Sequence, residues 1–133
     1  MAFYRTREGA VTAADSFTAL GSLYGQSTTA AIQVPAGASQ IVGIVATMSQ
    51  DGNTAGTSTF AIQLSGDGLS NGQETLVIGS SSNVGTETGN AVSNLPMELD
   101  VAIPCVGSNQ VSVAVAMDTD IGALAASVTL VFA

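Results

Sequence analysis

The chain is 133 residues long, 46% of them hydrophobic and only 9% charged, and its formal net charge at pH 7 is −8. Ordinary soluble domains carry about 25% charged residues. Disordered chains are typically charged and poor in apolar residues, so this composition excludes disorder and predicts one domain with a single hydrophobic core. The sequence has no His, and its two cations are Arg5 and Arg7. Nucleic-acid binding needs several cations to displace phosphate counterions, so we expect none by the folded body.

The first 24 residues show no strong alternation of apolar and polar side chains. We interpret residues 1–24 as an N-terminal arm that lies against the domain or a neighbouring subunit, and residues 25–133 as the β-sandwich domain. The start of the arm, which contains both arginines, is the one place where a phosphate or an acidic partner surface could bind. Its candidate assembly residues are Phe3, Tyr4, Arg5 and Arg7.

No apolar segment follows the charged start, so we expect no secretory signal. No stretch reaches the ~18 uninterrupted apolar residues of a membrane helix, so we expect no transmembrane segment. Residues 11–20 are the best helix candidate, but their weak apolar spacing and β-branched residues favour no helix. Phe17–Leu20 is a weak strand candidate.

Beyond the arm, apolar and polar residues alternate with period two, which places successive side chains on opposite faces of a strand. The segments that alternate are Ala30–Pro35, Gln40–Gln50, Thr59–Ser65, Glu74–Gly79, Leu95–Cys105, Gln110–Thr119 and Ser127–Ala133. The side chains that we expect to face the core are Ile32, Val34, Val42, Ile44, Ala46, Met48, Phe60, Ile62, Leu64, Leu76, Ile78, Leu95, Met97, Leu99, Val101, Ile103, Cys105, Val111, Val113, Val115, Met117, Val128, Leu130 and Phe132.

The segment Leu95–Cys105 alternates most clearly and has Glu98 and Asp100 on its polar face. A register slip of one residue would bury both carboxylates, so the register is strongly fixed. Pro96 and Pro104 indicate an edge strand or strand ends, because proline cannot donate to a central ladder.

Turn-rich pieces separate these strands: residues 35–39, 51–56, 66–72, 80–93 and 106–109. We expect the longest of them, 80–93, to project as a loop, and 106–109 to connect a hairpin. Many short strands at this spacing predict an all-β fold, a single-domain antiparallel β-sandwich of about eight strands.

The residue types that enzymatic catalysis requires are scarce in this sequence. Nucleophilic catalysis needs a base such as His or Lys beside the nucleophile, and the sequence has neither. The glycine-rich segment 66–72 has no Lys after it, which favours a turn over a phosphate-binding loop. Glu98 and Asp100 are a formal carboxylate pair for glycoside hydrolysis, but the absence of Trp favours a solvated face. We expect no enzymatic activity and no cofactor.

Calcium needs only oxygen ligands, and the segment from Asp51 and Asn53 to Gly56 fits the start of a calcium loop. The pattern fails where Ala55 and Ile62 occupy ligand positions. Asp118 and Asp120, beside the pair Glu98 and Asp100 on a neighbouring strand, are a second weak candidate site. We favour turn residues and solvated acids over a metal site at both places.

Cys105 is the single cysteine, so no intrachain disulfide is possible. Its place on the inward register of a predicted strand favours a small buried thiol.

A short polar-aromatic arm, about eight strands with long loops at one end, and a closing strand Val128-Thr129-Leu130-Val131-Phe132-Ala133 follow in that order. Together with the abundance of Gly, Ser, Thr and Ala and the scarcity of charge, this order resembles the single jelly-roll proteins of icosahedral virus shells. The resemblance covers Ala30–Ala133 as a pattern, and no short motif is matched, so no functional residue is carried over.

The resemblance implies a jelly-roll-like sandwich and a capsid, vertex or decoration subunit located in the virion. Its partners would be copies of itself and other coat proteins in a homo-oligomeric assembly. Capsid proteins that contact the genome often have a strongly basic arm, whereas this arm has two arginines. The departure points to a shell or vertex protein over an internal membrane or another protein layer.

Two alternative functions stay open. A module that binds carbohydrate or a cell surface needs an exposed aromatic platform, and Phe3, Tyr4, Phe17 and Tyr24 all fall in the arm instead of the strand loops. A subunit of an extracellular filament or surface layer would use the arm to complete a neighbour's sheet.

Overall fold

The computed structural model describes residues 2–22, 31–50, 54–83, 90–93 and 97–133, with the backbone alone at 22, 83, 90–93 and 97–100. The described residues contain no helix, so none that could cross a membrane. Their strands are β1 (Phe3–Val11), β2 (Thr18–Ala19), β3 (Gly21–Ser22), β4 (Ile32–Gln33), β5 (Gln40–Gln50), β6 (Gly56–Ser65), β7 (Gln73–Asn83), β8 (Asn90–Ser93), β9 (Met97–Pro104), β10 (Gln110–Met117) and β11 (Leu124–Phe132). The prediction of an all-β, single-domain antiparallel sandwich is confirmed.

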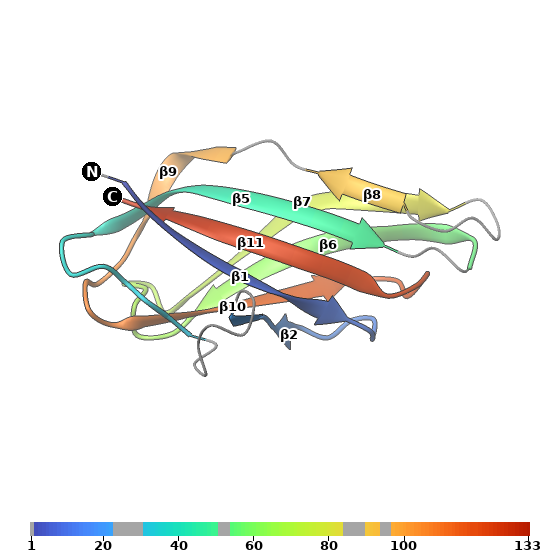
Figure 1. Ribbon diagram of the computed structural model, residues 1–133, viewed down its shortest axis with the longest axis horizontal. Coiled ribbons are helices and arrows are strands. Elements are labelled where there is room, and N and C mark those ends of the chain that lie inside the picture. The colour runs from blue at the N-terminus through green and yellow to red at the C-terminus, as the bar shows by residue number, and fades with distance from the viewer. Residues whose placement is uncertain (1, 23–30, 51–53, 84–89, 94–96) are drawn as a thin grey trace.

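Two antiparallel sheets form the sandwich (Figure 1). The six-stranded sheet has the order β3-β1-β11-β5-β8, and β9 also pairs with β5. The five-stranded sheet has the order β2-β10-β6-β7, and β4 also pairs with β10. β8 pairs with Thr47–Gln50 and β9 with the start of β5, so these two short strands share one edge of β5.

The pairings are nested. The first strand pairs with the last (β1 with β11), β2 pairs with β10, β5 with β8 and β9, and β6 with β7. A long antiparallel ribbon gives this nesting when it is rolled so that β11 also pairs with β5 and β10 with β6. The strand order is therefore that of a jelly roll.

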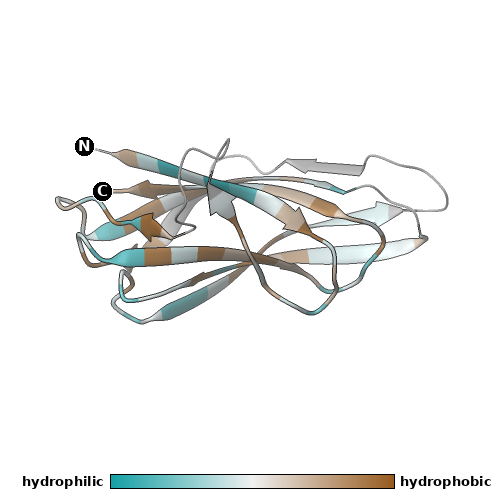
Figure 2. Cartoon of the chain, turned by 60° about the horizontal axis from the view of Figure 1, so that its bottom comes forward, coloured by the Kyte–Doolittle hydropathy of each residue, from teal (hydrophilic) through white to brown (hydrophobic). Residues whose placement is uncertain are grey.

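The core lies between the two sheets and is built by the alternation that the sequence shows. Figure 2 shows hydrophobic and polar residues alternating along the strands. The predicted inward residues of β6, β10 and β11 are all buried: Phe60, Ile62, Leu64, Val111, Val113, Val115, Met117, Val128, Leu130 and Phe132. Ile32 and Val34 are fully buried as well, which confirms the prediction for the segment around β4.

A bulge in β5 overturns one predicted inward position. Val42 was expected in the core, but it is half-buried, and Ile41 is fully buried instead. Val131 pairs with Gly43 while Phe132 pairs with Ile41, so one residue of β5 is left off the ladder. An extra residue on one strand reverses the facing of every residue beyond it.

A larger irregularity in β9 overturns a second position. Val101 was expected to face the core and is 83% exposed. Ile41 of β5 pairs with Ile103 of β9, and Gly43 of β5 pairs with Glu98 of β9. Between these two pairs β5 has one residue, Val42, whereas β9 has the four residues 99–102, so β9 contains extra residues at this point. Ile103 and Cys105 are buried as predicted. Leu95 lies outside the described residues, as do the side chains of Met97 and Leu99.

Two segments that were predicted to lie outside the strands take part in the sheets, and the weak strand candidate Phe17–Leu20 contains β2. The segment predicted as an arm contributes β1, which pairs with β11 along its full length, and also β2 and β3. The predicted loop 80–93 contains the end of β7 and all of β8. The predicted hairpin connection at 106–109 is wrong, because β9 and β10 belong to different sheets.

A buried polar contact links the two sheets. The Gln50 side chain on β5 is fully buried, and its Nε2 donates to the carbonyl oxygen of Gly122 at 2.9 Å. The hydroxyl of Ser81 on β7, in the other sheet, donates to Gln50 Oε1 at 2.6 Å. Because these groups are shielded from water, removing one partner leaves the others without a hydrogen bond.

We expect Gln50→Leu to lower the free energy of unfolding by about 1–3 kcal/mol, since it leaves the Gly122 carbonyl and the Ser81 hydroxyl unsatisfied. Ser49→Ala, an exposed position next to it on β5, is the control and should change stability by less than about 0.5 kcal/mol. Urea unfolding followed by circular dichroism measures both. Equal stability of the two variants would show that the contact contributes nothing.

Candidate functional site

The register of β1 places both cations of the chain on the inner face of the six-stranded sheet. Arg5 pairs with Leu130 and Arg7 with Val128, two residues that are fully buried in the core. Directly opposed residues of an antiparallel pair have their side chains on the same face. Both arginines therefore point toward the side of the sheet that faces the core.

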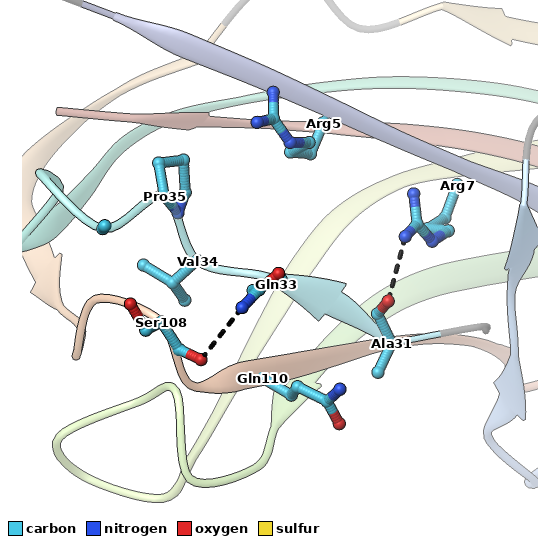
Figure 3. Close-up of a pocket in the computed structure, with 9 residues that line it drawn as sticks. Arg5, Arg7, Ala31, Gln33, Val34, Pro35, Ser108 and Gln110 are labelled. Carbon is cyan, nitrogen blue, oxygen red and sulfur yellow. Dashed lines mark hydrogen bonds between the residues drawn. The ribbon is translucent and has the colours of Figure 1, made fainter. Parts of the chain in front are cut away.

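The arginines are tolerated there because β1 lies near the edge of its sheet. Only β3 lies beyond it, and β3 pairs with Arg7 and Glu8 alone. Inner-face side chains at such an edge meet the rim of the opposite sheet, where water has access. Between the two rims lies a cleft of about 480 Å³ lined by Arg5, Arg7, Ala31, Gln33, Val34, Pro35, Ala36, Ser108 and Gln110 (Figure 3).

Arg7 is held in place by hydrogen bonds to the backbone. Its Nη2 donates to the carbonyl oxygen of Ala31 at 2.9 Å, next to β4, and its Nη1 donates to the carbonyl oxygen of Thr6 at 2.8 Å. Partial burial, and secondarily the positive charge of Arg5, lowers the pKa of Arg7 from its ordinary value. An arginine nonetheless stays charged in a protein. The Arg7 side chain thus joins the rim of one sheet to the rim of the other.

Arg5 is exposed, and its Nη1 donates to the carbonyl oxygen of Tyr4 at 2.9 Å. Across the cleft, Gln33 Nε2 donates weakly to the carbonyl oxygen of Ser108 at 3.4 Å. Figure 3 shows the two arginines on one side of the cleft and Gln33, Ser108 and Gln110 on the other. The described lining therefore combines two donor-only guanidinium groups with side chains that both donate and accept, and it includes no acidic residue.

A second surface feature lies on the outer face of the five-stranded sheet. Ala61 of β6 pairs with Ala116 of β10 on one side and with Val77 of β7 on the other. Phe17 precedes Thr18, which pairs with Val115, so Phe17 continues the same row beside Ala116. We name these four residues, Phe17, Ala61, Val77 and Ala116, the apolar stripe.

The apolar stripe lines an open groove of about 420 Å³ that also has Asp15, Thr59 and Asp118 in its walls. Val77 is 72% exposed and Phe17 is 40% exposed. The outward-facing residues around it on β6 and β10 are uncharged: Thr57, Thr59, Gln63, Ser65, Ser112 and Ala114. The charged side chains that line the groove are therefore the two carboxylates in its walls, Asp15 and Asp118, and not residues on the outer face of β6 or β10.

The predicted calcium ligands are engaged elsewhere or lie outside the described residues. Asp118 Oδ1 accepts a hydrogen bond from the backbone N–H of Thr59 at 2.7 Å, and Asp120 Oδ1 accepts one from Gly122 at 3.1 Å. Both carboxylates thus stabilise local backbone. Asp51 and Asn53, and the side chains of Glu98 and Asp100, lie outside the described part of the chain. Within that part, no three His, Cys, Asp or Glu residues gather into a metal-binding group.

The four predicted assembly residues of β1 divide between the two faces of the sheet. Phe3 packs against the core and shares its face with Arg5 and Arg7, whereas Tyr4 is 63% exposed on the opposite face. Gln33, Ser108 and Gln110, which line the cleft together with the arginines, were not predicted as site residues. The apolar stripe was not predicted either, because its members come from four separate segments.

Cys105 is buried, as predicted. Desolvation by burial raises the pKa of its thiol. At a given pH the folded protein therefore has less of the nucleophilic thiolate than the unfolded chain.

We expect a thiol reagent at pH 8 to modify Cys105 in the native protein at least about tenfold more slowly than in guanidinium, because the thiolate is scarce and shielded. The free energy of unfolding should also fall as the pH rises above the ordinary thiol pKa of 9.0, since the unfolded chain then loses the proton first. Equal labelling rates in the two states would contradict the burial of this thiol.

No protein-family model matches this chain, and no curated protein matches its sequence. Its function is therefore inferred from its fold, its charge and its surfaces.

Proposed function

We propose that this protein is a structural subunit of a virus particle, a capsid, vertex or decoration protein that acts through symmetric self-assembly and contacts with neighbouring coat proteins. The observation that carries the proposal is the apolar stripe on the outer face of a jelly-roll sandwich, where the outward residues of β6 and β10 are uncharged. Its mechanism is geometric, since a rigid sandwich presents the same patch many times in a closed shell.

Charge favours this face for contacts between copies. With a formal net charge of −8, two copies repel one another wherever acidic residues meet. The described outward positions of β6 and β10 carry no charge, so a contact centred on these strands limits that repulsion to Asp15 and Asp118 in the walls of the groove. Phe17 and Val77 supply the exposed apolar side chains that such a contact would bury.

The alternative of a carbohydrate- or cell-surface-binding module receives less support. Tyr4 and Phe17 are the exposed aromatic residues of the described chain. Tyr4 lies on the outer face of the six-stranded sheet, and Phe17 lies on the outer face of the five-stranded sheet. Two rings on opposite sides of the sandwich do not form one stacking platform.

We expect the purified protein to form discrete symmetric oligomers or shells in electron micrographs and in light scattering coupled to size-exclusion chromatography. Val77→Glu should weaken self-association at least about tenfold, because each contact would then bury an unpaired carboxylate. The folded subunit should persist, since substitutions at exposed positions usually change stability by less than about 0.5 kcal/mol.

Gln73→Glu is the matched control. It adds the same charge to the same face of β7, four residues from Val77 and about 13 Å away along the strand. Assembly that is equally strong in both variants would rule out the apolar stripe as a contact. A strictly monomeric wild-type protein at every protein and salt concentration would count against a structural subunit.

A further inference from the structure

The cleft between the sheet rims concentrates the positive charge of the chain. Arg5 and Arg7 are its two Lys or Arg residues, and both line this one cleft. They are two residues apart on the same face of β1, so their Cα atoms are about 7 Å apart. Two like charges repel one another less on the outer face of a sheet, where water screens them more fully, than on its inner rim.

The cleft is equipped with hydrogen-bond donors. The Arg7 guanidinium is fixed by the carbonyl oxygens of Ala31 and Thr6. Arg5 is exposed, and one of the five N–H donors of its guanidinium binds the Tyr4 carbonyl oxygen. The side-chain amides of Gln33 and Gln110 and the hydroxyl of Ser108 complete the polar lining, which is shown in Figure 3.

The carboxylate of Asp67 binds the backbone beside this lining. Asp67 Oδ1 accepts a hydrogen bond from the backbone N–H of Gln110 at 3.0 Å, and Asp67 is not a lining residue. Among the described residues that line the cleft, the two like charges on β1 thus lie beside amides and a hydroxyl and no carboxylate is included. An anion placed there would reduce the repulsion between Arg5 and Arg7 and accept hydrogen bonds from both sides.

We propose that this cleft is a binding site for a small molecule that carries an oxyanion, a phosphate or a carboxylate group. Arg5 is the residue that contacts the oxyanion, and Gln33 and Gln110 bind the polar body that carries it. A volume of about 480 Å³ exceeds what a bare phosphate fills and lies within the range of ordinary ligand pockets. The site lies on the inner rim and is separate from the apolar stripe, so it does not depend on the proposed structural role.

The inward position of the two arginines has a second explanation, which predicts a different response to added anions. Inward-pointing charges on an edge strand also protect the edge from pairing with another chain. In that case Arg5 prevents aggregation, and added anions have no specific effect. A neighbour's acidic side chain in the cleft would instead make the stability depend on protein concentration and not on added phosphate.

The test uses the full chain in Tris chloride, with inorganic phosphate and acetate added at matched ionic strength. We expect phosphate, and acetate more weakly, to raise the melting temperature by about 2–5 °C at concentrations well above the dissociation constant. In a ¹⁵N-labelled sample, the amide shifts caused by phosphate should be confined to β1, the residues around β4, and residues 108–110.

Arg5→Gln is the decisive variant, because Arg5 holds no distant segment in place, whereas Arg7 anchors Ala31. It should raise the phosphate dissociation constant about tenfold to a hundredfold, the loss expected for a hydrogen bond to a charged group. Gln63→Glu brings the net charge to the same −9 as Arg5→Gln (−8 − 1), on the outer face of the other sheet, and should bind phosphate as the wild type does.

Three outcomes would overturn the proposal. One is an equal effect of chloride and phosphate on the wild-type melting temperature. Another is equal phosphate binding by Arg5→Gln and the wild type. A third is an equal loss of binding in Arg5→Gln and Gln63→Glu, which would show only the effect of net charge. None of these results bears on assembly through the apolar stripe, which the Val77→Glu variant tests separately.

Discussion

The pairing of β1 with β11 determines how the six-stranded sheet is completed and where the two arginines lie. Phe3 pairs with Phe132 and Val11 with Leu124, so the first strand covers the whole length of the last one. The register is supported on the outer face by a 2.7 Å hydrogen bond between the hydroxyls of Thr6 and Thr129. A slip of one residue would turn Glu8 toward the core and move both arginines out of the cleft. One register therefore completes the fold and creates its basic cleft.

The strands with strict alternation could be predicted from the sequence, because burial between two sheets selects apolar residues at every second position. β10 and β11 have apolar residues at every inward position, and β6 departs from the rule at the buried Ser58. The rule failed where a bulge interrupts the regular pairing of a strand with its neighbour. The misplacement of Val42 and Val101 has this cause, since a bulge changes the facing of residues without changing their pattern in the sequence.

The cleft could not be predicted for a related reason. The segment of β1 was interpreted as part of an arm because the first 24 residues show no strong alternation, and arginines occupy two of the positions that face inward. The structure resolves this by placing those positions at the sheet rim, opposite β4 and residues 108–110. Three segments that are distant in the sequence form the cleft, and no local pattern encodes that they meet. The buried thiol of Cys105, by contrast, followed directly from its place in an alternating segment.

In the described part of the chain, side-chain hydrogen bonds of Gln50 and Arg7 tie the layers of this sandwich together in addition to apolar packing. Gln50 joins β5 to Ser81 in the opposite sheet, and Arg7 joins β1 to the backbone beside β4. Sliding one layer over the other would break a shielded hydrogen bond at the first place and a charge-assisted one at the second. Under a sideways load the two sheets should consequently move together. The sandwich should then transmit mechanical stress to a neighbouring molecule without deforming internally.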